Sequence, residues 1–165
     1  MKSVQPIPSK ILSSAELERE VRRWRLKNKK IVFTNGVFDI LHEGHIASLS
    51  QAATYGNILV VGLNNDASVK RLKGPARPVN NENARALVLV SLLAVDAVVL
   101  FEDDTPLELI KTIMPDVLVK GGDYTVEQVV GAKEVIENGG EVILADIIEG
   151  VSTTTIIEKM KGPSS

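Results

Sequence analysis

Short runs of apolar residues alternate along the chain with segments in which apolar residues recur every three or four positions. Continuous apolar runs of five to seven residues are typical of strands buried on both faces of a sheet, and they occur at 30–34, 57–63, 96–101, 116–120 and 141–145. The intervening periodicity predicts helices over about 14–27, 44–54, 81–93, 105–113 and 127–138, and a last helix from near Ser152. The basic segment 64–80 predicts a loop that contains a short helical piece.

Strands separated by helices of this length pair in parallel, through right-handed crossovers. The sequence therefore predicts a three-layer, doubly wound α/β fold of the Rossmann-like type, with a parallel five-stranded sheet. A chain of 165 residues can bury one self-sufficient core. We expect residues 1–28 to form a lead-in and a helix, and residues 29–162 to form the α/β domain.

Composition excludes several kinds of protein. The formal net charge of −2 argues against a broad surface for nucleic acid or for an anionic membrane. The chain has no cysteine, which removes disulfides and thiolate chemistry and suits a reducing cytoplasm. No segment approaches the ~18 apolar residues of a membrane span, and the N-terminus lacks the apolar stretch of a signal peptide. We expect a cytoplasmic protein that binds neither nucleic acid nor membrane.

Polar segments follow the strands at the edge where doubly wound sheets bind ligands. The first of them contains both histidines of the chain, His42 and His45, three positions apart at the start of a predicted helix. This spacing places both imidazoles on one face of the first turn, where unpaired backbone N–H groups favour a phosphate. Gly44 would let a phosphate or a base approach the backbone closely. A zinc site is disfavoured, because only carboxylates remain as further ligands.

The other strand ends add cations and glycines. Lys73 and Arg77 are each constrained by a nearby proline and lie beside the expected phosphate site, although a run of cations is often only solvated. Arg85, in the following helix, is a candidate for a second phosphate. Asp39 could cap a helix, orient a histidine or hold Mg²⁺, and we favour a positioning role. The glycines in residues 120–124 allow a ligand to come close, either the nucleoside or the acceptor, or else they form only a tight turn.

Two motifs resemble a known superfamily. Residues 42–45 (HEGH), within TNGVFDILHEGHI, resemble the HxGH signature of the HIGH-type nucleotidyltransferases, which implies that His42 and His45 contact a triphosphate and stabilise the transition state at its α-phosphate. Residues 149–154 (EGVSTT) resemble the second motif, an arginine-led segment ending in GISTT. Ile147 stands where that arginine would be, so only hydroxyl and N–H groups remain to hold the phosphates here, unless Ser152 serves simply as a helix cap.

From about residue 30 to 161 the chain is similar to the adenylyltransferase domain of the bacterial heptose enzymes, notably in KGPARPVN and VKGGDY. The resemblance implies transfer of AMP from ATP, with Mg²⁺, to D-glycero-β-D-manno-heptose 1-phosphate, giving ADP-heptose and pyrophosphate for the lipopolysaccharide core. In many bacteria this domain is fused to a kinase, so a separate heptose 7-phosphate kinase is expected upstream. Relatives commonly dimerise, and the apolar helix over 85–93 is the candidate contact for a homodimer.

These considerations assign three groups of site residues. We expect catalysis from His42, His45 and Lys73, and contact with the acceptor phosphate from Arg77 and Arg85. The residues expected to bind ATP are Asn35, Gly36, Val37, Phe38, Gly44, Lys120, Gly121, Asp123, Gly150, Ser152, Thr153 and Thr154. A sugar 1-phosphate is already ionised at neutral pH, so the reaction needs no general base.

Two alternatives stay open. A glycerol-3-phosphate cytidylyltransferase shares both motifs, and its nucleotide preference would distinguish it. A nucleotide-binding module without catalysis would release no pyrophosphate. An NAD-binding domain is excluded, because no GxGxxG sequence follows the first strand.

Overall fold

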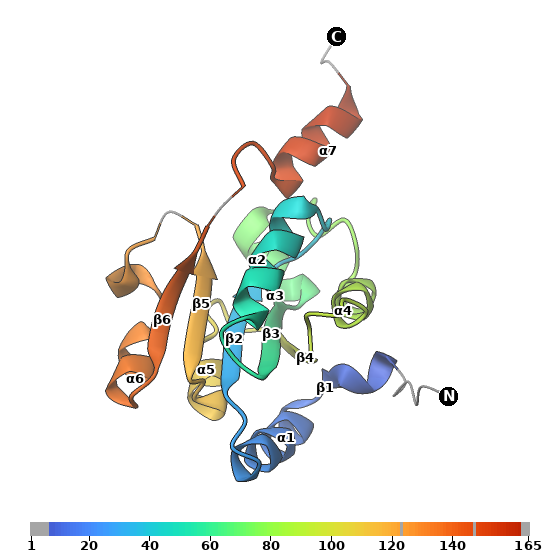
Figure 1. The fold of residues 1–165 in the computed structure, drawn as a ribbon. Coiled ribbons are helices and arrows are strands. Elements are labelled where there is room, and N and C mark those ends of the chain that lie inside the picture. The colour runs from blue at the N-terminus through green and yellow to red at the C-terminus, as the bar shows by residue number, and fades with distance from the viewer. Residues whose placement is uncertain (1–6, 123, 147, 163–165) are drawn as a thin grey trace.

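A single parallel sheet organises the computed structural model, which describes residues 7–122, 124–146 and 148–162 (Figure 1). Within these residues the strands run in the order β1-β4-β3-β2-β5-β6, and every neighbouring pair is parallel. Their bounds are β1 (Ile11–Leu12), β2 (Ile31–Gly36), β3 (Ile58–Asn64), β4 (Ala97–Phe101), β5 (Val117–Gly121) and β6 (Glu141–Ala145). The chain order reverses between β2 and β5, which creates the switch point at which such sheets bind ligands.

The doubly wound α/β prediction is confirmed, and all five predicted strands are present. The predicted strand number was wrong by one, because β1 adds a sixth strand at the edge. Its two residues pair with β4, Ile11 opposite Val98 and Leu12 opposite Val99. A strand of two residues is too short to give a periodic signal, and it is recognised only through its partner.

Helices cover both faces of the sheet. They are α1 (Ser14–Leu26), α2 (Glu43–Ala53), α3 (Asp66–Lys73), α4 (Glu82–Val90), α5 (Leu107–Ile113), α6 (Ala132–Glu137) and α7 (Thr153–Lys161), with 3-10 turns η1 (Ile7–Lys10) and η2 (Val126–Gln128). Side chains of α1, α5 and α6 pack on one face, where Phe33 of β2 lies. Side chains of α2 and α4 pack on the other, where Val32 lies. Alternate residues of β2 thus face opposite layers of helices, as burial on both faces requires.

Two segments differ from the sequence prediction. Residues 66–73 form a full helix, because the Asn65 side chain accepts a hydrogen bond from the Ser68 backbone N–H at 2.9 Å and so caps it. The helix expected over 127–138 is split into η2 and α6. Gly131 lies between them with φ +84°, and a Cβ there would come within 2.6 Å of the Ile110 side chain. The close packing against α5 therefore requires glycine at the break.

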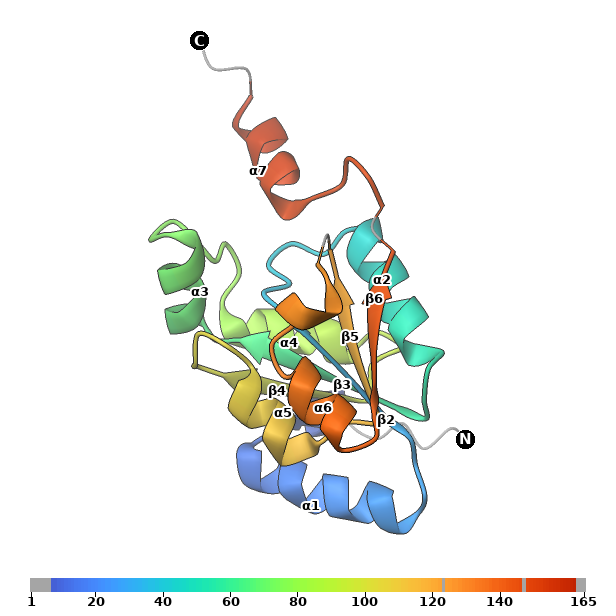
Figure 2. The same cartoon turned by 90° about the vertical axis from the view of Figure 1, so that its left-hand side faces the viewer.

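The last helix stands apart from the layers. In both views α7 extends away from the sheet, beyond the carboxyl ends of the strands (Figures 1 and 2). None of its described side chains is buried. Its first residues lie over the edge at which β2 and β5 end, and this edge carries the candidate site.

Candidate active site

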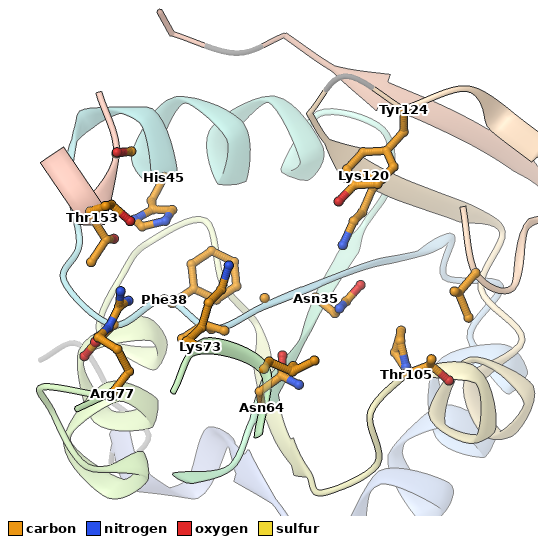
Figure 3. Close-up of a pocket in the computed structure, with 18 of the residues that line it drawn as sticks. Asn35, Phe38, His45, Asn64, Lys73, Arg77, Thr105, Lys120, Tyr124 and Thr153 are labelled. Carbon is orange, nitrogen blue, oxygen red and sulfur yellow. The ribbon is translucent and has the colours of Figure 1, made fainter. Parts of the chain in front are cut away.

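A cavity of about 650 Å³ opens at the carboxyl edge of the sheet (Figure 3). Its walls come from the loop after β2, the start of α2, α3, the loop before α5, the end of β5, the segment around η2 and the start of α7. This volume lies within the range of small-molecule sites. The cavity occupies the switch point between β2 and β5.

Most of the residues singled out from the sequence line this cavity. They are Asn35, Gly36, Val37, Phe38, His42, His45, Lys73, Arg77, Lys120, Ser152, Thr153 and Thr154. Gly44, Gly121 and Gly150 neighbour lining residues in the chain but do not themselves line the cavity. Asp123, expected to bind ATP, and Ile147, at the position of the missing arginine, lie outside the described residues.

The two histidines form a stacked pair at the start of α2. Their ring centroids lie 3.8 Å apart with an interplanar angle of 23°, and the ring of Phe38 lies 5.1 Å from that of His45. Glycines make room for these rings. A Cβ on Gly44 would lie 3.0 Å from the His42 ring, and one on Gly36 would lie 2.9 Å from the Phe38 ring. Gly44 therefore makes room for the His42 ring, and the close approach of a ligand to its backbone stays a prediction.

Burial keeps the pair uncharged. The Nδ1 atoms of His42 and His45 are buried without a hydrogen-bond partner in the described part of the chain. Burial, together with a smaller effect of the neighbouring His42, lowers the pKa of His45 to about 4. Burial also lowers the pKa of His42, against the opposing effect of the Glu43 carboxylate. The pair is therefore neutral at pH 7, and Nε2 is the ring nitrogen left to each for a ligand.

Asp39 fastens the loop that carries Arg77. Its carboxylate accepts hydrogen bonds from Arg77 Nε at 2.7 Å and from the backbone N–H groups of Val79 and Asn80. Burial raises the pKa of Asp39, but the bonds from Asn80, Val79 and Arg77 outweigh it, so the net pKa lies below its ordinary value. Only 3% of Asp39 is exposed. These contacts match the positioning role favoured from the sequence, and they hold Arg77 at the cavity wall.

The structure contradicts the role expected for Arg85. It was expected to contact the acceptor phosphate, but it is 2% exposed and does not line the cavity. Its guanidinium donates to the carbonyls of Val37, Asn64 and Asn80 at 2.7–2.9 Å and to the Asp66 carboxylate at 2.7 Å. Four of its donors are thus used by the protein. Arg85 instead ties together the ends of β2 and β3, the start of α3 and the loop before α4.

Lys120, from the end of β5, lies across the cavity from His45 (Figure 3). Burial lowers the pKa of its ammonium, and the nearby Lys73 lowers it further. Its Nζ lies 5.5 Å from the centre of the Tyr124 ring.

The start of α7 is held by two side-chain hydrogen bonds. Ser152 Oγ accepts from the Thr155 N–H at 3.1 Å and so caps the helix, while Thr153 Oγ1 donates to the Ile40 carbonyl at 3.2 Å.

Several lining residues were given no individual role from the sequence, among them Tyr124, Thr105, Gln128 and Asn64, although Asn64 and Tyr124 belong to segments that were considered. Asn64 and Thr105 follow strands, so their position offered a signal. The cap position of α5 is Pro106, one residue beyond Thr105. Gln128 belongs to η2, which was expected to be part of a longer helix.

The described residues contain no cluster of three or more histidine, cysteine or acidic side chains that could hold a metal. The carboxylates at the cavity are also occupied, Asp39 by Arg77 and Asp104 by Arg71. The site therefore does not fit a metal held by protein ligands alone, and a Mg²⁺ ion would have to arrive bound to phosphate oxygens. The described helices are also each too short or too polar to cross a membrane.

Comparisons with known proteins agree with this geometry. Residues 33–159 match the family model described as cytidylyltransferase-like. The chain is 55% identical over 156 residues to the bifunctional protein HldE of Caulobacter vibrioides, and 56% identical over 154 residues to that of Paramagnetospirillum magneticum. These alignments cover 94% and 93% of this chain but 32% of each relative, so the chain spans about a third of their length.

Two solved structures have similar folds. The lipopolysaccharide core biosynthesis protein from Thermoplasma volcanium aligns with a TM-score of 0.58 and 29% identity, over 73% of this chain and 97% of that protein. Pantoate-beta-alanine ligase from Francisella tularensis aligns with a TM-score of 0.58 over 92% of this chain and 76% of its own. At 16% identity, the second likeness shows the fold alone.

Proposed function

This chain belongs to the cytidylyltransferase-like family, and we propose that it transfers AMP from ATP to D-glycero-β-D-manno-heptose 1-phosphate. The products are ADP-heptose, a precursor of the lipopolysaccharide core, and pyrophosphate. The observation that carries the reaction type is the stacked pair His42 and His45 at the start of α2, in a cavity that also contains Lys73 and the start of α7. The choice of substrate is supported by the identity to the HldE proteins and by the likeness to a lipopolysaccharide core biosynthesis protein.

The chemistry is an in-line displacement at the α-phosphate of ATP. An oxygen of the sugar phosphate forms a bond to the α-phosphorus while the bond to the β-phosphate oxygen breaks, and pyrophosphate leaves. The sugar phosphate is already ionised at neutral pH, so no side chain has to remove a proton. This suits a cavity whose carboxylates are both occupied by arginines.

Each group of side chains has a separate task. The neutral imidazoles of His42 and His45 donate Nε2–H to phosphate oxygens, and the N-termini of α2 and α7 hold the leaving phosphates. Lys73 stabilises the charge that develops at the α-phosphate. Mg²⁺ enters with the ATP phosphates. A heptose 7-phosphate kinase acts upstream.

Pyrophosphate release tests the proposal. The purified protein is assayed with Mg²⁺ and either ATP or CTP, each with heptose 1-phosphate or glycerol 3-phosphate. We expect turnover with ATP and heptose 1-phosphate. Turnover with CTP and glycerol 3-phosphate would instead identify a glycerol-3-phosphate cytidylyltransferase. If no combination released pyrophosphate, the result would favour a nucleotide-binding module without catalysis.

The His45→Ala variant tests the role of the pair. Loss of one preorganised donor at a developing charge costs about 100-fold in kcat. The exposed Ser50, on the same helix, provides the matched control Ser50→Ala, which should retain wild-type turnover. Near-normal turnover by a folded His45→Ala protein would contradict the assigned role.

A further inference from the structure

The end of the cavity farthest from the histidines combines a cation with an aromatic ring. Lys120 Nζ lies 5.5 Å from the centre of the Tyr124 ring, and both residues line the cavity. Figure 3 places Lys120 and Tyr124 across the cavity from His45 and Thr153, with Lys73 between the two ends. The cavity therefore has two chemically different halves.

Two ammonium groups in this cavity have no carboxylate partner among the residues that the structure describes. Within the described residues, neither Lys73 nor Lys120 takes part in an ion pair. The two are close enough for Lys73 to lower the pKa of Lys120, in addition to the larger effect of burial. Like charges in a partly buried site repel each other, and an anion between them would remove that repulsion. The arrangement thus favours an anionic ligand that reaches Lys120 as well as Lys73.

The direction of the reaction identifies that anion. In an in-line displacement the attacking oxygen approaches opposite to the leaving group. The leaving pyrophosphate belongs at the helix N-termini beside His42 and His45, so the attacking phosphate comes from the Lys120 end. Arg85 is buried and bonded within the protein, and Arg77 is held by Asp39 on the side of the cavity where His45 and Thr153 lie (Figure 3). Lys120 is then the cation left for the acceptor phosphate in this half of the cavity.

Tyr124 is positioned as a platform beside that phosphate. Its ring packs against Gly122, where φ is +125° and a Cβ would lie 2.7 Å from the ring. Glycine at this position is thus needed for the ring to occupy its place. Tyr124 remains 44% exposed, so part of its apolar face is available to a ligand. A flat, half-exposed ring suits the apolar face of a sugar.

We propose that Lys120 and Tyr124 form the acceptor half of the site, in which Lys120 binds the acceptor's phosphate and Tyr124 packs against its sugar ring. This inference rests on the proposed function and deepens it, and it moves Lys120 from the ATP-binding group to the acceptor. Tyr124 then selects a ring-bearing phosphate ester over a small linear one such as glycerol 3-phosphate.

Steady-state kinetics of Lys120→Met tests the first half. Loss of a hydrogen bond to a charged group should raise KM for heptose 1-phosphate about 10- to 100-fold, while KM for ATP stays near the wild-type value. Lys120→Arg should restore part of the loss. Lys70→Met, at an exposed position of α3 outside the cavity, is the matched control and should match wild type. A rise in KM for ATP with an unchanged KM for the sugar phosphate would overturn the assignment.

Direct binding separates this inference from the proposed function. Heptose 1-phosphate and inorganic phosphate are titrated calorimetrically into the protein saturated with the unreactive α,β-methylene analogue of ATP. Lys120→Met should weaken both ligands, whether or not the wild type releases pyrophosphate. Tyr124→Ala should weaken only the sugar phosphate, by about 2- to 10-fold, and Tyr124→Phe should retain most of it. If Lys120→Met binds both ligands with wild-type affinity, Lys120 does not bind the acceptor phosphate. If Tyr124→Ala weakens both ligands equally, Tyr124 does not pack against the sugar ring. If the wild type binds no sugar phosphate, both assignments are refuted.

Discussion

At the scale of single residues, His45 links the site to the pH dependence of stability. Its pKa falls to about 4 in the folded chain, because the ring is buried beside His42, whereas an exposed histidine titrates at 6.5. Below pH 6.5 the His45 ring is therefore protonated in the unfolded chain but stays neutral in the folded chain until the pH approaches 4. The stability that depends on this neutral ring is fully present above pH 6.5 and is lost as the pH falls toward 4.

His45→Gln tests this linkage, because glutamine keeps a polar side chain but cannot be protonated. We expect the wild type to lose more unfolding free energy than the variant between pH 7 and pH 5, measured by urea denaturation. Other acid-sensitive groups, including the Asp39 carboxylate, are common to both proteins and cancel in the difference. Parallel pH profiles would mean that His45 is already as easy to protonate in the folded chain as in the unfolded one.

The sequence predicts the contacts of a residue well when its contact partner lies close by in the chain, and poorly when the partner is distant. The i, i+3 spacing places His42 and His45 on one face of a turn, so their pairing is readable from the sequence. The partners of Arg85 are backbone carbonyls at the ends of separate strands. Carbonyls occur at every residue, so no pattern distinguishes those that a buried arginine will meet.

At the scale of elements, α7 is weakly attached to the rest of the molecule. Its described side chains are all at least partly exposed, and its start is joined to the loop before α2 by the bond from Thr153 Oγ1 to the Ile40 carbonyl. Residues 151–154, which carry the first backbone N–H groups of this helix, line the cavity. A triphosphate would give these groups acceptors and so order the helix.

Hydrogen exchange measures this ordering. On addition of ATP we expect amides at the start of α7 to exchange about tenfold more slowly or more, because one hydrogen bond to a charged group is worth about 1.5–3 kcal/mol. Amides of α6, remote from the phosphates in the proposed complex, serve as the internal control. Unchanged exchange in α7 with saturating ATP would show that the triphosphate does not contact this helix.

The elements themselves differ in how far sequence predicts them. Apolar runs such as 58–63 identify buried strands, because burial on both faces leaves no room for polar alternation. The helix over 66–73 was underestimated, although Asn65 supplies its cap, because proline and basic residues around it favour a loop. The break at Gly131 depends on contact with Ile110 of a different helix, which no local pattern contains.

At the scale of the whole molecule, the cavity joins two groups of elements. β2, β3 and α3 supply Asn35, Asn64 and Lys73, while β5 and α7 supply Lys120 and Thr153. The alternation of strands and helices predicts that such a cavity lies at the carboxyl edge of the sheet. It does not predict the strand order, which decides that the ends of β2 and β5 are neighbours. That order brings the histidines and Lys120 into one site.

A ligand that contacts both groups should stabilise the chain against unfolding as a unit. At about 100 times its dissociation constant, ATP would add about 2.7 kcal/mol. For a chain of 165 residues this corresponds to a rise in Tm of roughly 5–10 °C, measurable by scanning calorimetry with Mg²⁺ present. CTP at the same concentration should give a smaller rise in Tm if the site selects adenine.

The Lys73→Met variant provides the comparison. Loss of a phosphate contact weakens the affinity for ATP, so it must reduce the ATP-induced rise in Tm at a fixed ATP concentration. An equal rise in Lys73→Met and in wild type would mean that ATP binds without Lys73, and an equal rise with CTP would remove the thermodynamic basis for preferring ATP.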